Sequence, residues 1–83
     1  MAERYLITGG AGNLACQLTF KLARPGDILT LVDVADAPAA PTAPGCVYLR
    51  GDVGDVAATA RLLRDLRPTT VLHFASLLSG SSE

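Results

Sequence analysis

The segment Thr-Gly-Gly-Ala-Gly-Asn-Leu-Ala, residues 8–15, holds the residues best suited to chemistry in this chain. Gly9 permits a tight turn after an apolar run, and Gly12 lets the backbone approach a phosphate group with no Cβ in the way. The apolar spacing that follows predicts a helix beginning near Gly12, whose unpaired N–H groups and positive dipole end would face that phosphate. Ala15 is small enough for the helix to pack closely on the preceding strand. We therefore predict a site for the pyrophosphate of a dinucleotide, contributed by Gly9, Gly12, Asn13 and Leu14.

Asp33 stands at the end of the second apolar run, about 20 residues after the glycines, where the dinucleotide fingerprint places an acidic residue. A carboxylate there accepts hydrogen bonds from the ribose hydroxyls and repels a 2′-phosphate. Val34 follows, and no arginine adjoins it to bind such a phosphate. These residues favour NAD over NADP as the cofactor. The alternative is a structural glycine turn with a solvated aspartate.

Four short apolar runs predict the strands that would position these residues. The second run is continuous rather than alternating, which favours a strand covered on both faces, as in a parallel sheet. The four runs span residues 5–8, 28–34, 46–50 and 70–75. Because parallel strands require right-handed crossovers, we expect an α/β fold with a Rossmann-type sheet, its four strands in the order 3-2-1-4. Residues 1–83 would form the N-terminal part of one dinucleotide-binding domain.

A first helix is expected to cover this sheet, because Leu14, Leu18 and Leu22 recur every four residues and form one apolar stripe. Pro25-Gly26 ends that pattern. Three prolines in residues 35–45 exclude a helix interior and predict an extended surface loop between the second and third strands.

A second helix is expected over residues 56–66, with Asp55 as its N-terminal cap. Arg67-Pro68 ends it. The residues expected to face the sheet are Val56, Ala60, Leu63 and Leu66.

Composition narrows the classes of partner. Seven basic and eight acidic residues leave no basic surplus, so no nucleic acid partner is expected. The apolar runs are far shorter than the about 20 residues of a membrane span, and the N-terminus lacks the apolar centre of a signal peptide. We therefore expect a cytoplasmic protein without a membrane partner. Cys16 and Cys46 would be small buried thiols, and no clustered ligands indicate a metal site.

Taken together, these features resemble the N-terminal part of an extended short-chain dehydrogenase/reductase, the group that contains NAD-dependent epimerases and dehydratases of nucleotide sugars. The motifs, in the family's order, are Thr-Gly-Gly-Ala-Gly at 8–12, Asp33, Gly-Asp-Val at 51–53 and His-Phe-Ala-Ser at 73–76. The resemblance implies that Asp52 and Val53 approach the adenine, and that Ala75 and Ser76 line the path toward the nicotinamide. It also implies that a homodimer would need a part of the protein beyond this segment.

Two positions depart from the family pattern, which often has an aromatic or apolar residue at position 13 and glycine at position 15. Ala15 is compatible with the fingerprint. Asn13 is a candidate for capping the helix, for meeting a phosphate, or for exposure to solvent.

Residues 75–83 are similar to segments of the short-chain type L-threonine and D-erythronate dehydrogenases, in which a serine at the position of Ser79 lies near the substrate. This resemblance implies an oxidoreductase that uses NAD to oxidise a secondary alcohol on a small hydroxy or amino acid. A nucleotide-sugar epimerase or dehydratase is one alternative. A non-catalytic dinucleotide-binding module is another.

The family's catalytic Tyr-x-x-x-Lys pair is not present in this chain. Tyr5 is followed four residues later by Gly9, Tyr48 by Asp52, and the single lysine is Lys21. His73 lies inside a predicted strand and has no partner with which to form a site, which favours a structural role. We therefore predict no catalytic residue here, and expect the rest of the cofactor domain and the substrate domain to lie outside these residues.

Overall fold

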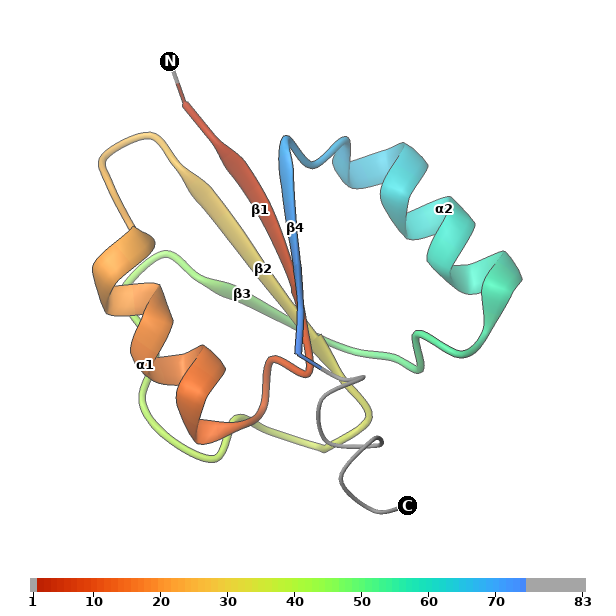
Figure 1. The fold of residues 1–83 in the computed structure, drawn as a ribbon, viewed down its shortest axis with the longest axis horizontal. Coiled ribbons are helices and arrows are strands. Elements are labelled where there is room, and N and C mark those ends of the chain that lie inside the picture. Colours follow the sequence, from red (N-terminus) through yellow and green to blue (C-terminus); the bar gives the residue numbers. More distant parts are fainter. Residues whose placement is uncertain (1, 75–83) are drawn as a thin grey trace.

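The computed structural model describes residues 2–74 and shows a four-stranded sheet with two helices (Figure 1). The elements, in chain order, are β1 (Arg4–Thr8), α1 (Asn13–Leu22), β2 (Ile28–Asp33), β3 (Val47–Arg50), α2 (Val56–Leu66) and β4 (Thr70–His73). The strand order is β3-β2-β1-β4 and every pairing is parallel. The predicted Rossmann-type sheet is confirmed.

The pairing register brings the ends of all four strands to one edge of the sheet, called here the carboxyl edge. Thr8 at the end of β1 pairs with Val32 on one side and with His73 on the other. Asp33 at the end of β2 pairs with Arg50 at the end of β3. Residues that follow the strands therefore gather at this edge, at the lower end of the strands in Figure 1.

The face of the sheet that α1 covers holds the main core. Ile7, Leu29 and Leu31 pack there against Ala15 of the helix. The residues of α1 that are buried are Ala15, Cys16 and Thr19. The predicted leucine stripe is wrong at Leu14, which is 62% exposed, whereas the half-buried Leu22 packs against this core. The sheet supplies the large side chains on this face, and small helix residues let α1 approach it closely.

The crossover loop, residues 34–46, connects β2 to β3 without a helix, as the prolines predicted. Its contact with α1 was not predicted. Ala43 is buried, and its N–H donates to the buried hydroxyl of Thr19 at 2.9 Å. Near its start, the N–H of Ala39 donates to the carbonyl of Ala11 at 2.7 Å. Backbone hydrogen bonds to α1 and to the residues before it thus replace the packing that a crossover helix would supply.

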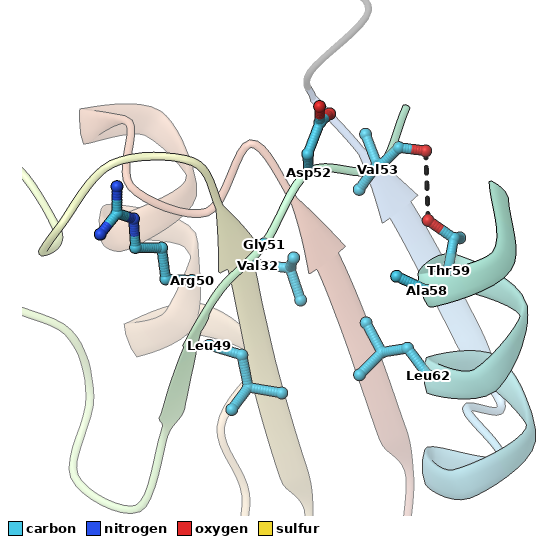
Figure 2. Close-up of a pocket in the computed structure, with 9 residues that line it drawn as sticks. All are labelled: Val32, Leu49, Arg50, Gly51, Asp52, Val53, Ala58, Thr59 and Leu62. Atoms are coloured by element: carbon cyan, nitrogen blue, oxygen red, sulfur yellow. Dashed lines mark hydrogen bonds between the residues drawn. The ribbon is translucent and has the colours of Figure 1, made fainter. Parts of the chain in front are cut away.

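The other helix, α2, covers the opposite face, since Val32 and Leu49 alternate with the core residues of β2 and β3 and turn toward Ala58 and Leu62 (Figure 2). Asp55 caps α2 as predicted, with Oδ1 accepting the N–H of Ala58 at 3.1 Å.

The predicted buried stripe of α2 is wrong. Val56 is 79% exposed, Ala60 and Leu63 are also exposed, and only Leu66 of the four is half-buried. None of the residues of α2 is fully buried. Leu62 and Leu63 are neighbours in the sequence, so the apolar pattern fits a stripe through either of them. The helix turns Ala58, Leu62 and Leu66 inward.

Neither helix in the described part of the chain is long and apolar enough to cross a membrane. Cys16 and Cys46 are free thiols, the first buried and the second half-buried.

Candidate functional site

The glycine loop, residues 9–12, joins β1 to α1 at the carboxyl edge. Gly9 has a φ of 68°, in the left-handed region that glycine adopts without strain. Gly10 lies directly on β2, where a Cβ would stand 2.6 Å from Cβ of Leu31. No role for Gly10 was predicted from the sequence. The doubled glycine was the available signal, but its reason is a contact with a strand 21 residues away in sequence.

Gly12 occupies the N-cap of α1, so a capping role for Asn13, which is exposed, is wrong. A Cβ on Gly12 would meet only the carbonyl oxygen of Gly9, at an ordinary 3.5 Å, so packing within the protein does not demand glycine here. Gly12 has no side chain to cap the helix, and the first turn of α1 contains no acidic residue. The N–H groups of this turn have no partner within the helix, and its positive dipole end is not offset by a local carboxylate.

Asp33 connects the glycine loop to β2. Its Oδ2 accepts the N–H of Ala11 at 3.0 Å, and its Oδ1 accepts the N–H of Val34 at 2.7 Å. The half-buried carboxylate is thereby fixed beside the helix N-terminus. The structure brings together the two features that the sequence paired, the glycines and the acid at the end of the second strand.

Asp52 and Val53 lie in the loop that follows β3, whose first residue, Gly51, donates its N–H to the carbonyl of Asp33 at 2.7 Å. Asp52 is exposed and points beyond the carboxyl edge, with Oδ1 accepting the N–H of Gly54 at 2.8 Å (Figure 2). The carbonyl of Val53 accepts the hydroxyl of Thr59 at 3.1 Å. The loop is therefore tied to both β2 and α2, while the second carboxylate oxygen of Asp52 faces outward.

Two hollows adjoin this loop. The first, the apolar hollow of about 230 Å³, lies between the sheet and α2 (Figure 2). It is lined by Val32, Leu49, Arg50, Gly51, Asp52, Val53, Ala58, Thr59 and Leu62. The second, the edge hollow of about 340 Å³, lies at the carboxyl edge and is lined by Val34, Arg50, Gly51 and Asp52. The edge hollow stands between the residues that follow Asp33 and the carboxylate of Asp52.

Two side chains on the α1 face have raised pKa values. Burial raises the pKa of Tyr48 above its ordinary 10.0, and the carboxylates of Asp33 and Asp36 raise it further. Burial also raises the pKa of the Cys46 thiol above its ordinary 9.0, although hydrogen bonds with Thr19 and Ala43 act in the opposite direction. Both groups stay protonated at neutral pH, so neither acts as a base or a thiolate there.

His73 ends β4 beside Thr8, and its Nδ1 shares a hydrogen bond of 2.5 Å with the hydroxyl of that residue. This contact joins the ends of β1 and β4, in agreement with the structural role predicted for His73. Within residues 2–74 no cluster of three or more potential metal ligands occurs. The remaining predicted site residues, Ala75, Ser76 and Ser79, lie outside the described residues.

The comparisons with known proteins agree on one family. The family model described as NAD dependent epimerase/dehydratase matches residues 5–83. In sequence, the chain is similar to a UDP-glucose 4-epimerase from Azospirillum brasilense, with 34% identity over 75 residues that cover 89% of this chain and 22% of that protein.

In structure, the chain is similar to the Bordetella bronchiseptica enzyme WbmG in complex with NAD, with a TM-score of 0.75 and 29% identity, covering 90% of this chain and 25% of that one. WbmG has also been solved with both NAD and UDP. The epimerase Mth375 from Methanothermobacter thermautotrophicus has a TM-score of 0.73 and 28% identity, covering 89% of this chain and 23% of that one. The chain therefore spans about a quarter of the length of these relatives.

Proposed function

Because the chain belongs to the NAD dependent epimerase/dehydratase family, we propose that its carboxyl edge is the adenosine and pyrophosphate half of an NAD site. The observation that carries this proposal is the hydrogen bond between Ala11 and the carboxylate of Asp33, 3.0 Å long. It places a helix N-terminus and an acidic side chain next to each other, and these are the two groups that hold the pyrophosphate and the ribose in the dinucleotide fingerprint. The known NAD complex of WbmG, which shares this fold, supports the same ligand.

The glycine loop supplies the phosphate contacts in this proposal. The N–H groups of Asn13 and Leu14 begin α1 and have no partner within the helix. Gly12 places no side chain in front of them, and the uncompensated dipole favours an anion. Gly9, Gly12, Asn13 and Leu14 are therefore the residues proposed to hold the pyrophosphate.

Asp33 is proposed to accept the ribose hydroxyls. A carboxylate offers about four acceptor positions, so the bonds from Ala11 and Val34 leave positions for a ligand. The edge hollow, which Val34 and Asp52 line, is proposed for the adenine. Val53 would contribute through its backbone, and Ala75 and Ser76 would extend the site toward the nicotinamide.

Bound NAD supplies a hydride acceptor for a carbon that carries a secondary alcohol. The proposed role of residues 1–83 is to bind and orient the cofactor. The Tyr-x-x-x-Lys pair that would move the alcohol proton is not among them. We propose a nucleotide sugar as the substrate of the protein, because the similar Azospirillum brasilense protein is a UDP-glucose 4-epimerase and WbmG has been solved with UDP.

A small hydroxy or amino acid is the second candidate substrate. It is favoured by the resemblance of residues 75–83 to the L-threonine and D-erythronate dehydrogenases, with Ser79 near the substrate.

The test begins with calorimetric titration of the protein with NAD, for which saturable one-site binding is expected. A folded protein that fails to bind NAD would refute the proposal. Incubation with UDP-glucose or UDP-galactose, followed by NMR, then tests for epimerisation, and NADH absorbance tests for oxidation of threonine or erythronate. Residues 1–83 lack the Tyr-x-x-x-Lys pair, so both turnover tests need a longer form of the protein that contains such a pair. In that form, NAD binding without turnover of either substrate class would favour the non-catalytic module.

A further inference from the structure

Arg50 lies beside the proposed ribose site, although it is 17 residues away from Asp33 in sequence. It is the register partner of Asp33, because both residues end their strands. Its Nε donates to the carbonyl of Val34 at 3.2 Å, and its Nη1 lies 3.0 Å from Oδ1 of Asp36. Figure 2 shows the side chain turned away from the apolar hollow. No arginine adjoins Val34 in sequence, but the sheet places one next to it in space.

This position places Arg50 near the ribose 2′ position, where NADP carries a phosphate and NAD carries a hydroxyl. A 2′-phosphate would stand where Asp33 meets the ribose, and a guanidinium is well suited to bind a phosphate through two parallel hydrogen bonds. Arg50 also lines the edge hollow together with Val34, Gly51 and Asp52. The chain therefore carries a phosphate-binding side chain within a site whose carboxylate favours an unphosphorylated ribose.

The carboxylate of Asp36 occupies the guanidinium of Arg50. It pairs with the guanidinium and offsets its charge, while the carbonyl of Val34 takes a second donor of the same group. The neighbouring Tyr48 donates its hydroxyl to the carbonyl of Ala35 at 2.6 Å, which holds the start of the crossover loop against β3. Two side chains of β3 thus fix the backbone that presents Asp36.

We propose that Asp36 is a specificity-determining residue, which engages Arg50 and so keeps a guanidinium from binding the 2′-phosphate of a phosphorylated dinucleotide. Asp33 repels that phosphate directly, and Asp36 acts through Arg50. The inference rests on the proposed function, because it needs the adenosine ribose at Asp33.

The test compares NAD and NADP affinities of Asp36→Asn with those of the unmodified protein, by calorimetry at low and high salt. Freeing the guanidinium should strengthen NADP binding by up to about fivefold, the size expected for an exposed ion pair, while the affinity for NAD changes less than about twofold. The gain should shrink at high salt, because it is electrostatic. Asp36 is 87% exposed, so the variant is expected to fold, and retained NAD binding verifies this in the same experiment.

Two controls separate this effect from a general change of charge. Asp65→Asn makes the same charge change in the last turn of α2, next to the start of β4, and should leave the affinity for NADP unchanged. Adding Arg50→Ala to Asp36→Asn should abolish the gain. An unchanged affinity for NADP, a gain that survives Arg50→Ala, or an equal gain in Asp65→Asn would overturn the inference while NAD binding still upheld the proposed function. Failure of the unmodified protein to bind NAD would refute the proposed function itself.

Discussion

The two faces of the sheet are built from the same strands, yet they pack differently. On the α1 face, Ile7 and Leu31 are completely buried against the small side chain of Ala15. On the α2 face, the helix has no fully buried residue, and the apolar hollow separates it from the sheet. The difference shows that helix side chains set the depth of a core as much as strand side chains do, since small helix residues permit close approach.

The residues proposed to bind NAD also divide between the α1 side and the α2 side of the sheet. Asp33 and the glycine loop belong to the α1 side and are bonded to each other. Asp52 belongs to the α2 side, where it is exposed and bonds within its own loop. Three paired experiments test whether the α1 side carries most of the stability and most of the proposed binding energy, and a fourth examines a pH dependence of the α1 face.

The largest effect is expected from Leu31→Ala on the α1 face. Removing a completely buried leucine should lower the free energy of unfolding by about 2–5 kcal/mol. Val71→Ala on the α2 face, where the side chain is 49% exposed, should cost less than about 1 kcal/mol. Urea denaturation measures both. Equal losses would show that burial in this structure does not determine what these two side chains contribute to stability.

The next effect concerns NAD affinity. Asp33→Ala removes a fixed carboxylate that is proposed to bind the ribose, and should weaken NAD binding by about 1.5–3 kcal/mol. Asp52→Ala removes an exposed side chain and should weaken it by less than about 1 kcal/mol. Calorimetric titration of both variants gives the comparison, and a larger loss for Asp52→Ala would reverse the proposed division of binding energy.

A matched pair of glycines gives a smaller effect on stability. Gly10→Ala places a Cβ 2.6 Å from Leu31 and should destabilise the fold by about 1–3 kcal/mol. Gly54→Ala places a Cβ 3.1 Å from the movable carboxylate of Asp52 and should cost about 0.5 kcal/mol or less. Thermal unfolding distinguishes them. A tolerated Gly10→Ala would mean that the glycine loop can move away from β2.

The smallest effect is a pH dependence on the α1 face. Because burial raises the pKa of Cys46, the folded protein keeps the thiol proton to a higher pH than the unfolded chain does. The thiol's contribution to stability is therefore present below the ordinary pKa of 9.0 and is lost as the pH rises through the folded pKa. Urea denaturation at about pH 8 and about pH 10 should show a larger loss for the unmodified protein than for Cys46→Ala. Tyr48 titrates in both proteins, so the difference between them isolates the thiol.

Local patterns predicted much of this molecule. The four apolar runs, the extended proline segment and the Asp55 cap depend on neighbours in sequence, and the structure confirms them. The spacing between the glycines and Asp33 predicted that they would meet.

The errors concern contacts made at long range. The apolar periodicity located both helices but did not identify which face of each helix turns toward the sheet. The prediction placed the large leucines against the sheet, whereas the small Ala15 and Ala58 lie there. The need for Gly10 depends on Leu31, and the position of Arg50 depends on the register of two strands. Such relations exist only after the sheet has formed, so reading along the chain did not reveal them.

Ala11 is held on both sides of its backbone before any ligand is present. Its N–H donates to Asp33, its carbonyl accepts from Ala39, and the residue is buried. A loop constrained in this way is preorganised, because little conformational entropy remains to be lost when an anion binds. Association at this edge should therefore proceed in a single bimolecular step, with a rate set by encounter rather than by closure of the glycine loop.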